Sequence, residues 1–312
     1  MNILCIAGPT ASGKTALAVE LAKALDGEVV SCDSMQLYRG MDIGTAKPTP
    51  EEMQGVPHYM LDVCEPDEDF SAGRYVQTAD PIVQDILRRG KRVIVAGGTG
   101  LYMDALVAGR TFAPAPPPGF REALEARADR EGTEVLLAEI ARRDPQTAAR
   151  LHPSDRKRIL RALEIEAATG MTETEYHAET QRIPPKYRAC RIALTYSSRA
   201  QLYARIDRRV DQMLESGLLD EIHALLAKGV PENCTAMQAI GYKEFLAFLR
   251  GECTLTEAAD AVKLGSRHYA KRQLTWLRGH ADTFWLDRTE KTEFSAVLSA
   301  ARQIIADFDS GK

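Results

Sequence analysis

The sequence predicts an α/β fold, in which a parallel-sheet core carries a phosphate-binding loop and a mostly α-helical insertion. Strands and helices alternate over about the first 110 residues, which is typical of a parallel sheet with helices on both faces. The string Gly8-Pro9-Thr10-Ala11-Ser12-Gly13-Lys14-Thr15 follows an apolar run at residues 2–7 and fits the phosphate-loop (P-loop) pattern G-x-x-x-x-G-K-[ST]. A long segment between two proline clusters reads as helical.

The N-terminal part of the core is expected to contain alternating strands and helices. Expected strands lie at residues 2–7, 28–32, 59–63 and 91–96, and expected helices lie at residues 14–25 and 71–89. Gly90 follows the second helix at the position where a glycine commonly ends one. In such a sheet, ligands bind at the carboxyl ends of the strands.

Two proline-rich linkers enclose the expected insertion. The first contains Pro114 and the prolines at 116–118, and the second is Ile183-Pro184-Pro185. Residues 119–182 read as helical throughout. We therefore divide the chain into a first core part at 1–115, a helical insertion at 116–185 and a continuation of the core at 186–312. A continuous helical bundle with ordinary breaks remains an alternative.

The rest of the core is expected to be largely helical. A strand at 191–196 returns to the sheet, and a last strand lies at 283–287. Helices are expected at residues 199–215, 218–228, 237–249, 256–278 and 294–308.

Composition narrows the class of protein. The chain has 312 residues, a formal net charge of −4 and six cysteines without C-x-x-C spacing, which argues against a zinc site and against a disulfide framework. Its apolar runs are shorter than the ~20 residues that a membrane span needs, and the N-terminal run lacks the basic leader of a signal peptide. We expect a cytoplasmic protein that uses no membrane. The acidic balance gives no general case for nucleic-acid binding, so local basic clusters must make it.

The phosphate loop predicts the binding of a diphosphate or triphosphate. Its glycines let backbone N–H groups surround phosphate oxygens, and the following helix directs its positive N-terminal dipole at them. Lys14 adds a charge, and the Thr15 hydroxyl is suited to Mg²⁺. A glycine-rich turn without a ligand is the alternative. The loop alone leaves open whether the phosphates belong to a nucleotide.

Asp33 is the candidate catalytic carboxylate. It directly follows the strand at 28–32, which places it at the same sheet edge as the phosphate loop, where it could take a proton from a nucleophile or orient it. A helix-capping aspartate, or one that holds a water bound to Mg²⁺, is the alternative. Gln36 nearby has the paired donor and acceptor groups that suit an adenine edge.

The string Gly97-Gly98-Thr99-Gly100 follows the strand at 91–96, where many ATP-hydrolysing phosphate-loop enzymes place an aspartate for Mg²⁺. The glycine found there weakens an ATPase interpretation. These glycines allow either the close approach of a ligand or a tight turn.

Basic residues cluster locally although the chain is acidic overall. The clusters are Arg156, Lys157, Arg158 and Arg161; Arg182, Lys186, Arg188 and Arg191; Arg205, Arg208 and Arg209; and Lys263, Arg267, Lys271, Arg272 and Arg278. One such cluster is usually a solvated helix face, but several favour contact with a phosphate backbone. Tyr269 and Trp276 could stack on bases, although packing is the more common role.

Together these strings resemble the bacterial tRNA dimethylallyltransferase (tRNA isopentenyltransferase) family. The matching strings are the phosphate loop, Asp33-Ser34-Met35-Gln36 with Tyr38, Ile43-Gly44-Thr45-Ala46-Lys47-Pro48, Gly97-Gly98-Thr99-Gly100-Leu101-Tyr102, the residues 156–161, Ala239-Ile240-Gly241-Tyr242, and Lys271-Arg272-Gln273-Leu274-Thr275-Trp276. The resemblance implies transfer of a dimethylallyl group from dimethylallyl diphosphate to N6 of adenosine 37 in the anticodon loop of tRNA, with Mg²⁺ as cofactor and release of diphosphate.

The resemblance also implies roles for individual residues. Asp33, Lys14 and Thr15 would be catalytic, with Asp33 as base or amine-orienting group and Thr15 as the Mg²⁺ ligand. Diphosphate would contact Gly8, Thr10, Ala11, Ser12, Gly13, Lys14, Thr15 and Arg205. The tRNA would contact Asp33, Ser34, Met35, Gln36, Thr99, Arg121, Lys157, Arg158, Ile159, Leu160 and Arg161. The helical insertion would clamp the anticodon stem-loop, and a monomer would suffice.

Other functions remain open at this point. A small-molecule kinase would also use a phosphate loop and a carboxylate base, but it leaves the basic clusters unexplained. A prenyltransferase acting on free AMP would share the core chemistry without needing the residues of the insertion. A non-catalytic RNA binder switched by a nucleotide would give Asp33 no role.

Overall fold

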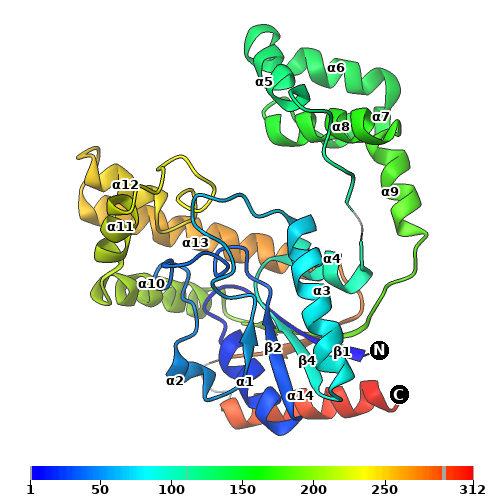
Figure 1. Cartoon of the computed structure of the whole chain (residues 1–312). Coiled ribbons are helices and arrows are strands. Elements are labelled where there is room, and N and C mark those ends of the chain that lie inside the picture. Colours follow the sequence, from blue (N-terminus) through cyan, green and yellow to red (C-terminus); the bar gives the residue numbers. More distant parts are fainter. Residues whose placement is uncertain (1, 111, 290–292, 312) are drawn as a thin grey trace. The chain divides into compact units, whose positions relative to one another are not determined.

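The chain forms two compact units. The computed structural model describes residues 2–110, 112–289 and 293–311, and the chain divides into one unit of residues 1–109 with 186–312 and a second unit of residues 110–185 (Figure 1). The second unit begins at Arg110, ahead of the expected start of the insertion at Pro116.

A parallel sheet organises the first unit. Among the described residues its six strands are β1 (Asn2–Ala7), β2 (Gly27–Ser31), β3 (His58–Tyr59), β4 (Arg92–Ala96), β5 (Arg188–Thr195) and β6 (Thr283–Asp287). Their order is β3-β2-β4-β1-β5-β6, and every pairing is parallel. The inner strands are almost wholly buried and apolar because both faces of the sheet are covered. The predicted fold class is confirmed.

Helices cover the two faces of this sheet (Figure 1). Helices α1 (Lys14–Ala24) and α14 (Phe294–Asp309) share one buried cluster with β1 and β5, which includes Leu17, Ile192 and Ile305. Helices α3 (Ala72–Arg88) and α4 (Gly100–Ala108) contribute to the cluster on the opposite face.

Further helices of the first unit extend that second cluster, namely α10 (Arg199–Glu215), α11 (Leu218–Ala227), α12 (Lys243–Leu249) and α13 (Leu255–Arg278). The short helix α2 (Pro50–Met53) has no buried residue and contacts α1. Tyr242 and Phe245, both fully buried, join α12 to the core. The long helix α13 begins with a capping box between Thr254 and Glu257, which satisfies N–H groups of its first turn.

The second unit is helical, as predicted. It contains α5 (Phe120–Glu131), α6 (Thr133–Arg143), α7 (Pro145–Arg150), α8 (Arg156–Thr169) and α9 (Glu173–Gln181). Its own small core includes Leu124, Leu136, Ile140, Ile159 and Leu160.

Two predicted elements were wrong in extent. The strand expected at 59–63 ends at Tyr59, because Met60 and Asp62 adopt positive φ angles of 62° and 54° that no strand can accommodate. The helix expected at 237–249 begins only at Lys243, because Gly241 has a φ of 97° and turns the chain just before it.

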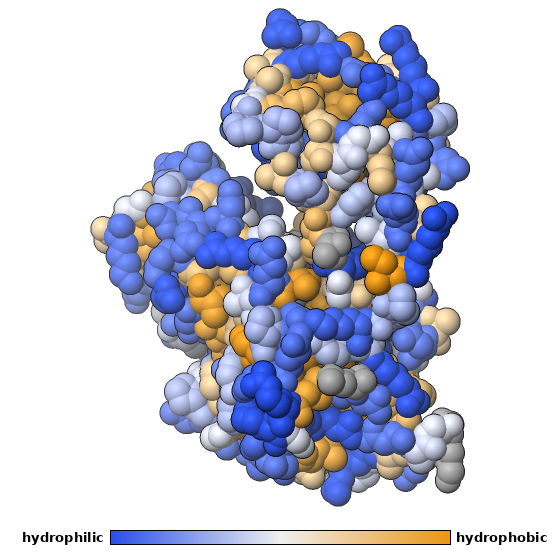
Figure 2. Space-filling view, turned by 45° about the vertical axis from the view of Figure 1, so that its right-hand side comes forward, coloured by the Kyte–Doolittle hydropathy of each residue, from blue (hydrophilic) through white to orange (hydrophobic). Residues whose placement is uncertain are grey.

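The surface is largely polar, as the many charged residues of the sequence suggest. The face shown in Figure 2 is mostly hydrophilic, and its hydrophobic residues form separate patches. Within the described part of the chain, no helix combines the length and the apolar character that crossing a membrane requires.

Candidate active site

Three loops meet at the carboxyl ends of β1, β2 and β4. Because these strands are neighbours, the loops at residues 8–13, 32–36 and 97–99 emerge side by side. The Cys32 N–H donates to the Ala96 carbonyl at 2.8 Å, and the Ser34 N–H donates to Thr99 Oγ1 at 2.9 Å. Phosphate loop and candidate carboxylate therefore share one edge of the sheet, as predicted.

The phosphate loop is shaped for an anion. Gly8 has a φ of 145°, and a Cβ there would lie 2.8 Å from the Leu194 carbonyl oxygen. Gly13 has a φ of 89° and begins α1, whose first turn no side chain of the described residues caps. The Ser12 side chain is fully buried, and its Oγ has no hydrogen-bond partner among the described residues. Uncapped N–H groups and an unpaired buried hydroxyl fit a bound phosphate.

Basic side chains surround the loop. Lys14 Nζ donates to the Pro9 carbonyl at 2.8 Å, and Arg205 Nε donates to the Ala11 carbonyl at 3.0 Å. Burial, reinforced by the charge of Arg209, lowers the pKa of Lys14 from its ordinary value of 10.5 to about 8, while Asp33 opposes the shift. Burial also lowers the pKa of Arg209. Lys14 and Arg209 are neighbouring positive charges that have lost part of their hydration, so an anion bound between them would stabilise both.

Arg209 was not among the predicted contacts, although it lies with the phosphate loop around the same pocket. It lies one helical turn after Arg205 on α10, so the i,i+4 spacing of the two arginines was the signal that could have found it.

Two pockets adjoin Asp33. One, of about 710 Å³, is lined by the phosphate loop with Lys14, Thr15, Arg205 and Arg209. The other, of about 290 Å³, has a mixed lining, with polar residues that include Arg209 and Arg272 and with an apolar wall. That wall contains Met35, Ile206, Val210, Met213, Ile240 and Val262. Asp33 lines both pockets, so it lies between the space beside the phosphate loop and the space that contains this apolar wall.

The side chain of Gln36 is occupied by the chain itself. Its Oε1 accepts from Ser31 Oγ at 3.1 Å, and its Nε2 donates to the carbonyls of Thr45 and Ala46 at 3.3 and 3.1 Å. The amide thus braces the loop at 41–47, and in this conformation it does not offer a free edge to an adenine.

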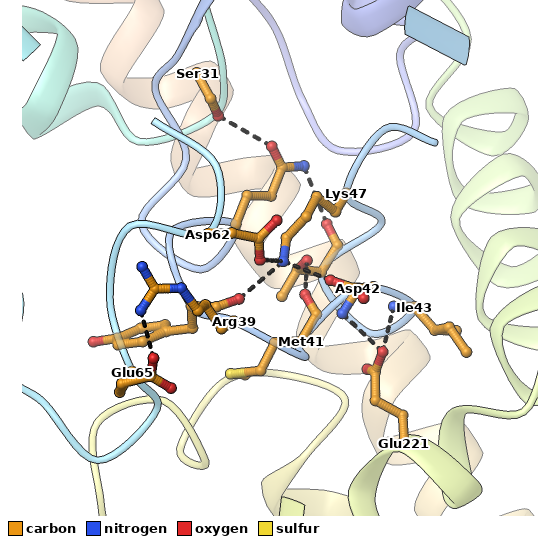
Figure 3. A network of polar contacts seen from close by, with 12 residues as sticks. Ser31, Arg39, Met41, Asp42, Ile43, Lys47, Asp62, Glu65 and Glu221 are labelled. Carbon is orange, nitrogen blue, oxygen red and sulfur yellow. Dashed lines mark hydrogen bonds and ion pairs between the residues drawn. The ribbon is translucent and has the colours of Figure 1, made fainter. Parts of the chain in front are cut away.

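The loop at 41–47 is also held by Glu221 on α11 (Figure 3). The Glu221 carboxylate accepts from the N–H groups of Asp42 and Ile43, each at 2.7 Å, and of Gly44 at 3.1 Å. Tyr242 donates to the same carboxylate at 2.6 Å, and its ring fills the space that a Cβ of Gly44 would need. The strings at 43–48 and 239–242 therefore form one wall of the site.

The glycines at 98 and 100 serve the packing of α13. A Cβ at Gly98 would lie 2.2 Å from Gln273 Nε2, and one at Gly100 would lie 2.3 Å from the Trp276 ring. The close approach that these glycines allow is made by the chain's own helix, and Trp276 has a packing role.

The predicted tRNA contacts in the second unit fall into different classes. Lys157 and Arg158 are exposed on α8, whereas Arg121 and Arg161 both pair with the buried carboxylate of Glu164, at 2.9 and 3.2 Å. Ile159 and Leu160 are buried in the core of the unit. The expected contact of these two side chains with tRNA is therefore revised, because they pack in the core of the unit and hold the helix in place.

The lowered pKa of Lys14 gives a testable prediction. Labelling of its amine, followed against pH by mass spectrometry, should show a midpoint near pH 8, because the neutral amine is the reactive form. Arg209→Met should move the midpoint upward, since it removes a neighbouring positive charge. Lys91, whose pKa is raised by its hydrogen bond to Asp26, is the internal control and should not respond. A Lys14 midpoint near 10.5 in both proteins would contradict the assignment.

Comparisons with known proteins match the whole chain. A sequence model of the family described as IPP transferase matches residues 36–280. The tRNA dimethylallyltransferase 1 of Trichlorobacter lovleyi is 47% identical over 305 residues, which cover 98% of this chain and 99% of the relative. The tRNA dimethylallyltransferase of Halalkalibacterium halodurans is 46% identical over 306 residues, covering 98% and 96%.

Solved structures agree. The full-length tRNA isopentenylpyrophosphate transferase from Bacillus halodurans matches with a TM-score of 0.73 and 43% identity, covering 98% of this chain and 95% of that one. A eukaryotic dimethylallyltransferase whose structure is described as acting on tRNA matches with a TM-score of 0.86 and 32% identity, covering 100% and 80%. With its parallel sheet and its phosphate-loop site, this chain belongs to the IPP transferase family.

Proposed function

We propose that this protein transfers a dimethylallyl group from dimethylallyl diphosphate to N6 of adenosine 37 in the anticodon loop of tRNA. The observation that carries the proposal is the position of Asp33, which lines both the pocket of the phosphate loop and the pocket with the apolar wall. A prenyl diphosphate has the same two parts, an anionic end and an apolar end. The full-length relatives named tRNA dimethylallyltransferase support the reaction and the acceptor.

In the proposed reaction, the N6 amine attacks the first carbon of the prenyl chain. The carbon–oxygen bond to diphosphate breaks, and its electron pair leaves with the diphosphate. Asp33 takes the proton that N6 loses, directly or after the bond forms. Negative charge grows on the leaving group, where the N–H groups of the loop, Lys14, Arg205 and Arg209 lie in place before the reaction, and such preorganised groups lower the barrier.

We propose Mg²⁺ as the cofactor, held by the Thr15 hydroxyl at the start of α1. Among the described residues, no group of three or more His, Cys, Asp or Glu side chains could hold a metal ion. A single protein hydroxyl suits Mg²⁺, because this ion usually keeps several waters and binds through few protein oxygens and the substrate's phosphates. When bound, it would neutralise charge on the diphosphate.

We propose tRNA, and not free AMP, as the acceptor of the prenyl group. An unpaired anticodon loop lets a base leave its stack at low cost, which a buried reaction site requires. We propose that the exposed Lys157 and Arg158 of the second unit bind the tRNA backbone. The kinase alternative gives these exposed basic residues no role.

Removal of the Asp33 carboxylate tests the proposal directly. In single-turnover assays with labelled dimethylallyl diphosphate, unmodified tRNA and Mg²⁺, Asp33→Asn should slow transfer about 10²- to 10⁴-fold, because the variant has no proton acceptor at this position. The affinity for tRNA should stay near that of the wild type, since the amide keeps the shape of the side chain.

Chelation of divalent cations in the same assay should stop transfer, and added Mg²⁺ should restore it.

The same assay, run with AMP or ATP beside tRNA, separates the proposed function from its alternatives. Label that enters AMP but not tRNA would favour the free-nucleotide prenyltransferase. Rapid ATP hydrolysis without label transfer would favour the kinase. A normal single-turnover rate in Asp33→Asn would remove the base assignment alone.

The proposed backbone contacts have their own test. The double variant Lys157→Ala, Arg158→Ala should weaken tRNA binding and reduce the slope of log affinity against log salt concentration by roughly 0.7–0.9 for each phosphate that the variant no longer neutralises. Arg130→Ala, which removes another exposed arginine of the same unit, is the matched control. An unchanged slope in the double variant, measured by filter binding, would show that these residues do not bind phosphates.

A further inference from the structure

One buried amide joins two of the loops of the site. Gln273 lies on α13 with a relative exposure of 6%. Its Oε1 accepts from the N–H of Thr10 in the phosphate loop at 2.8 Å, and its Nε2 donates to the Gly98 carbonyl at 3.0 Å. The proposed function gives the phosphate loop the leaving group to hold, but it assigns nothing to Gln273.

The helix that carries this amide packs closely against the loop at 97–100. Its Nε2 occupies the space that a side chain at position 98 would take, and Tyr269 donates to the same Gly98 carbonyl at 3.2 Å. One turn along α13, Trp276 donates to Asp104 on α4 at 2.8 Å. Its ring lies where a side chain at position 100 would be. Helix α13 is thereby fixed against the loop at 97–100.

The connection continues to the candidate base. Thr99, next to Gly98, accepts from the N–H of Ser34 at 2.9 Å, and Ser34 follows Asp33. A path of hydrogen bonds therefore runs from Thr10 through Gln273 and the 97–99 loop to the residue beside Asp33. Only a group with an acceptor on one side and a donor on the other can make both contacts of Gln273.

We propose that Gln273 is a positioning residue, which sets the phosphate loop at a fixed distance from the Asp33 loop. This inference rests on the proposed function. With the amide in place, the cradle of the leaving group and the proton acceptor keep their spacing while the prenyl group is transferred. Misplacement of reacting groups by about 1 Å can cost two orders of magnitude in rate.

Gln273→Glu separates this role from simple packing, because the carboxyl has the shape of the amide. When ionised, it still accepts from Thr10 but cannot donate to Gly98, and it brings negative charge near the diphosphate. When protonated, it has one donor and one acceptor, as the amide does. The variant should therefore regain function as the pH falls, whereas Gln273→Leu, which can form neither bond, should not.

The experiment measures single-turnover prenyl transfer to tRNA from pH 5.5 to 9, with each rate divided by that of the wild type at the same pH. Gln273→Glu should be slowed about 10- to 100-fold at the alkaline end and should recover toward the wild type at the acidic end. Gln273→Leu should be slowed at every pH. Both should bind inorganic diphosphate more weakly in calorimetry and bind tRNA normally. Gln303→Glu, the same exchange on the exposed face of α14, is the control and should match the wild type.

Two results would overturn the inference. Equal and pH-independent losses in both variants would mean that Gln273 only packs, and rates equal to the wild type would mean that it has no role. Failure of the wild-type protein to prenylate tRNA would instead contradict the proposed function, so the two failures are distinguishable.

Discussion

The site depends on positive charge that the fold concentrates before any substrate arrives. Lys14 lies half-buried at the start of α1, where loss of hydration, reinforced by the charge of Arg209, lowers its pKa to about 8. Like charges in a poorly solvated place destabilise a folded protein unless an anion joins them. These like charges lie at the carboxyl edge of the sheet. Beside them are uncapped N–H groups and the buried Ser12 hydroxyl, which has no partner among the described residues. A bound diphosphate would satisfy all of these groups together.

Around this charged centre, the other loops are fixed by contacts within the chain. Glu221 accepts hydrogen bonds from three successive N–H groups of the loop at 41–47, and Gln36 donates to two carbonyls of the same loop. Gln273 links the phosphate loop to the loop at 97–99. The loops are thus held by Gln36 within them and by Glu221 and Gln273, which lie on the helices α11 and α13. Preorganisation of this kind is what stabilises a developing charge efficiently.

Much of this arrangement could be predicted from sequence because its causes are local. The phosphate loop is a contiguous pattern, and the edge shared with Asp33 follows from parallel strands. The reason for Gly98 and Gly100 could not be predicted, because the atoms that exclude a Cβ there come from Gln273 and Trp276, far along the chain. The occupied amide of Gln36 escaped prediction for the same reason. The burial of Ile159 and Leu160 follows from the packing of α8 among helices whose arrangement no short string encodes.

We propose that the phosphate loop holds a diphosphate that leaves by cleavage of a carbon–oxygen bond, with no phosphoryl transfer. Dimethylallyl diphosphate labelled with heavy oxygen at the position bridging carbon and phosphorus tests it most directly, with mass spectrometry of the products. All of the label should be found in released diphosphate, with one diphosphate for each prenylated tRNA. Label in a prenyl alcohol, or a phosphate attached to the acceptor, would contradict it.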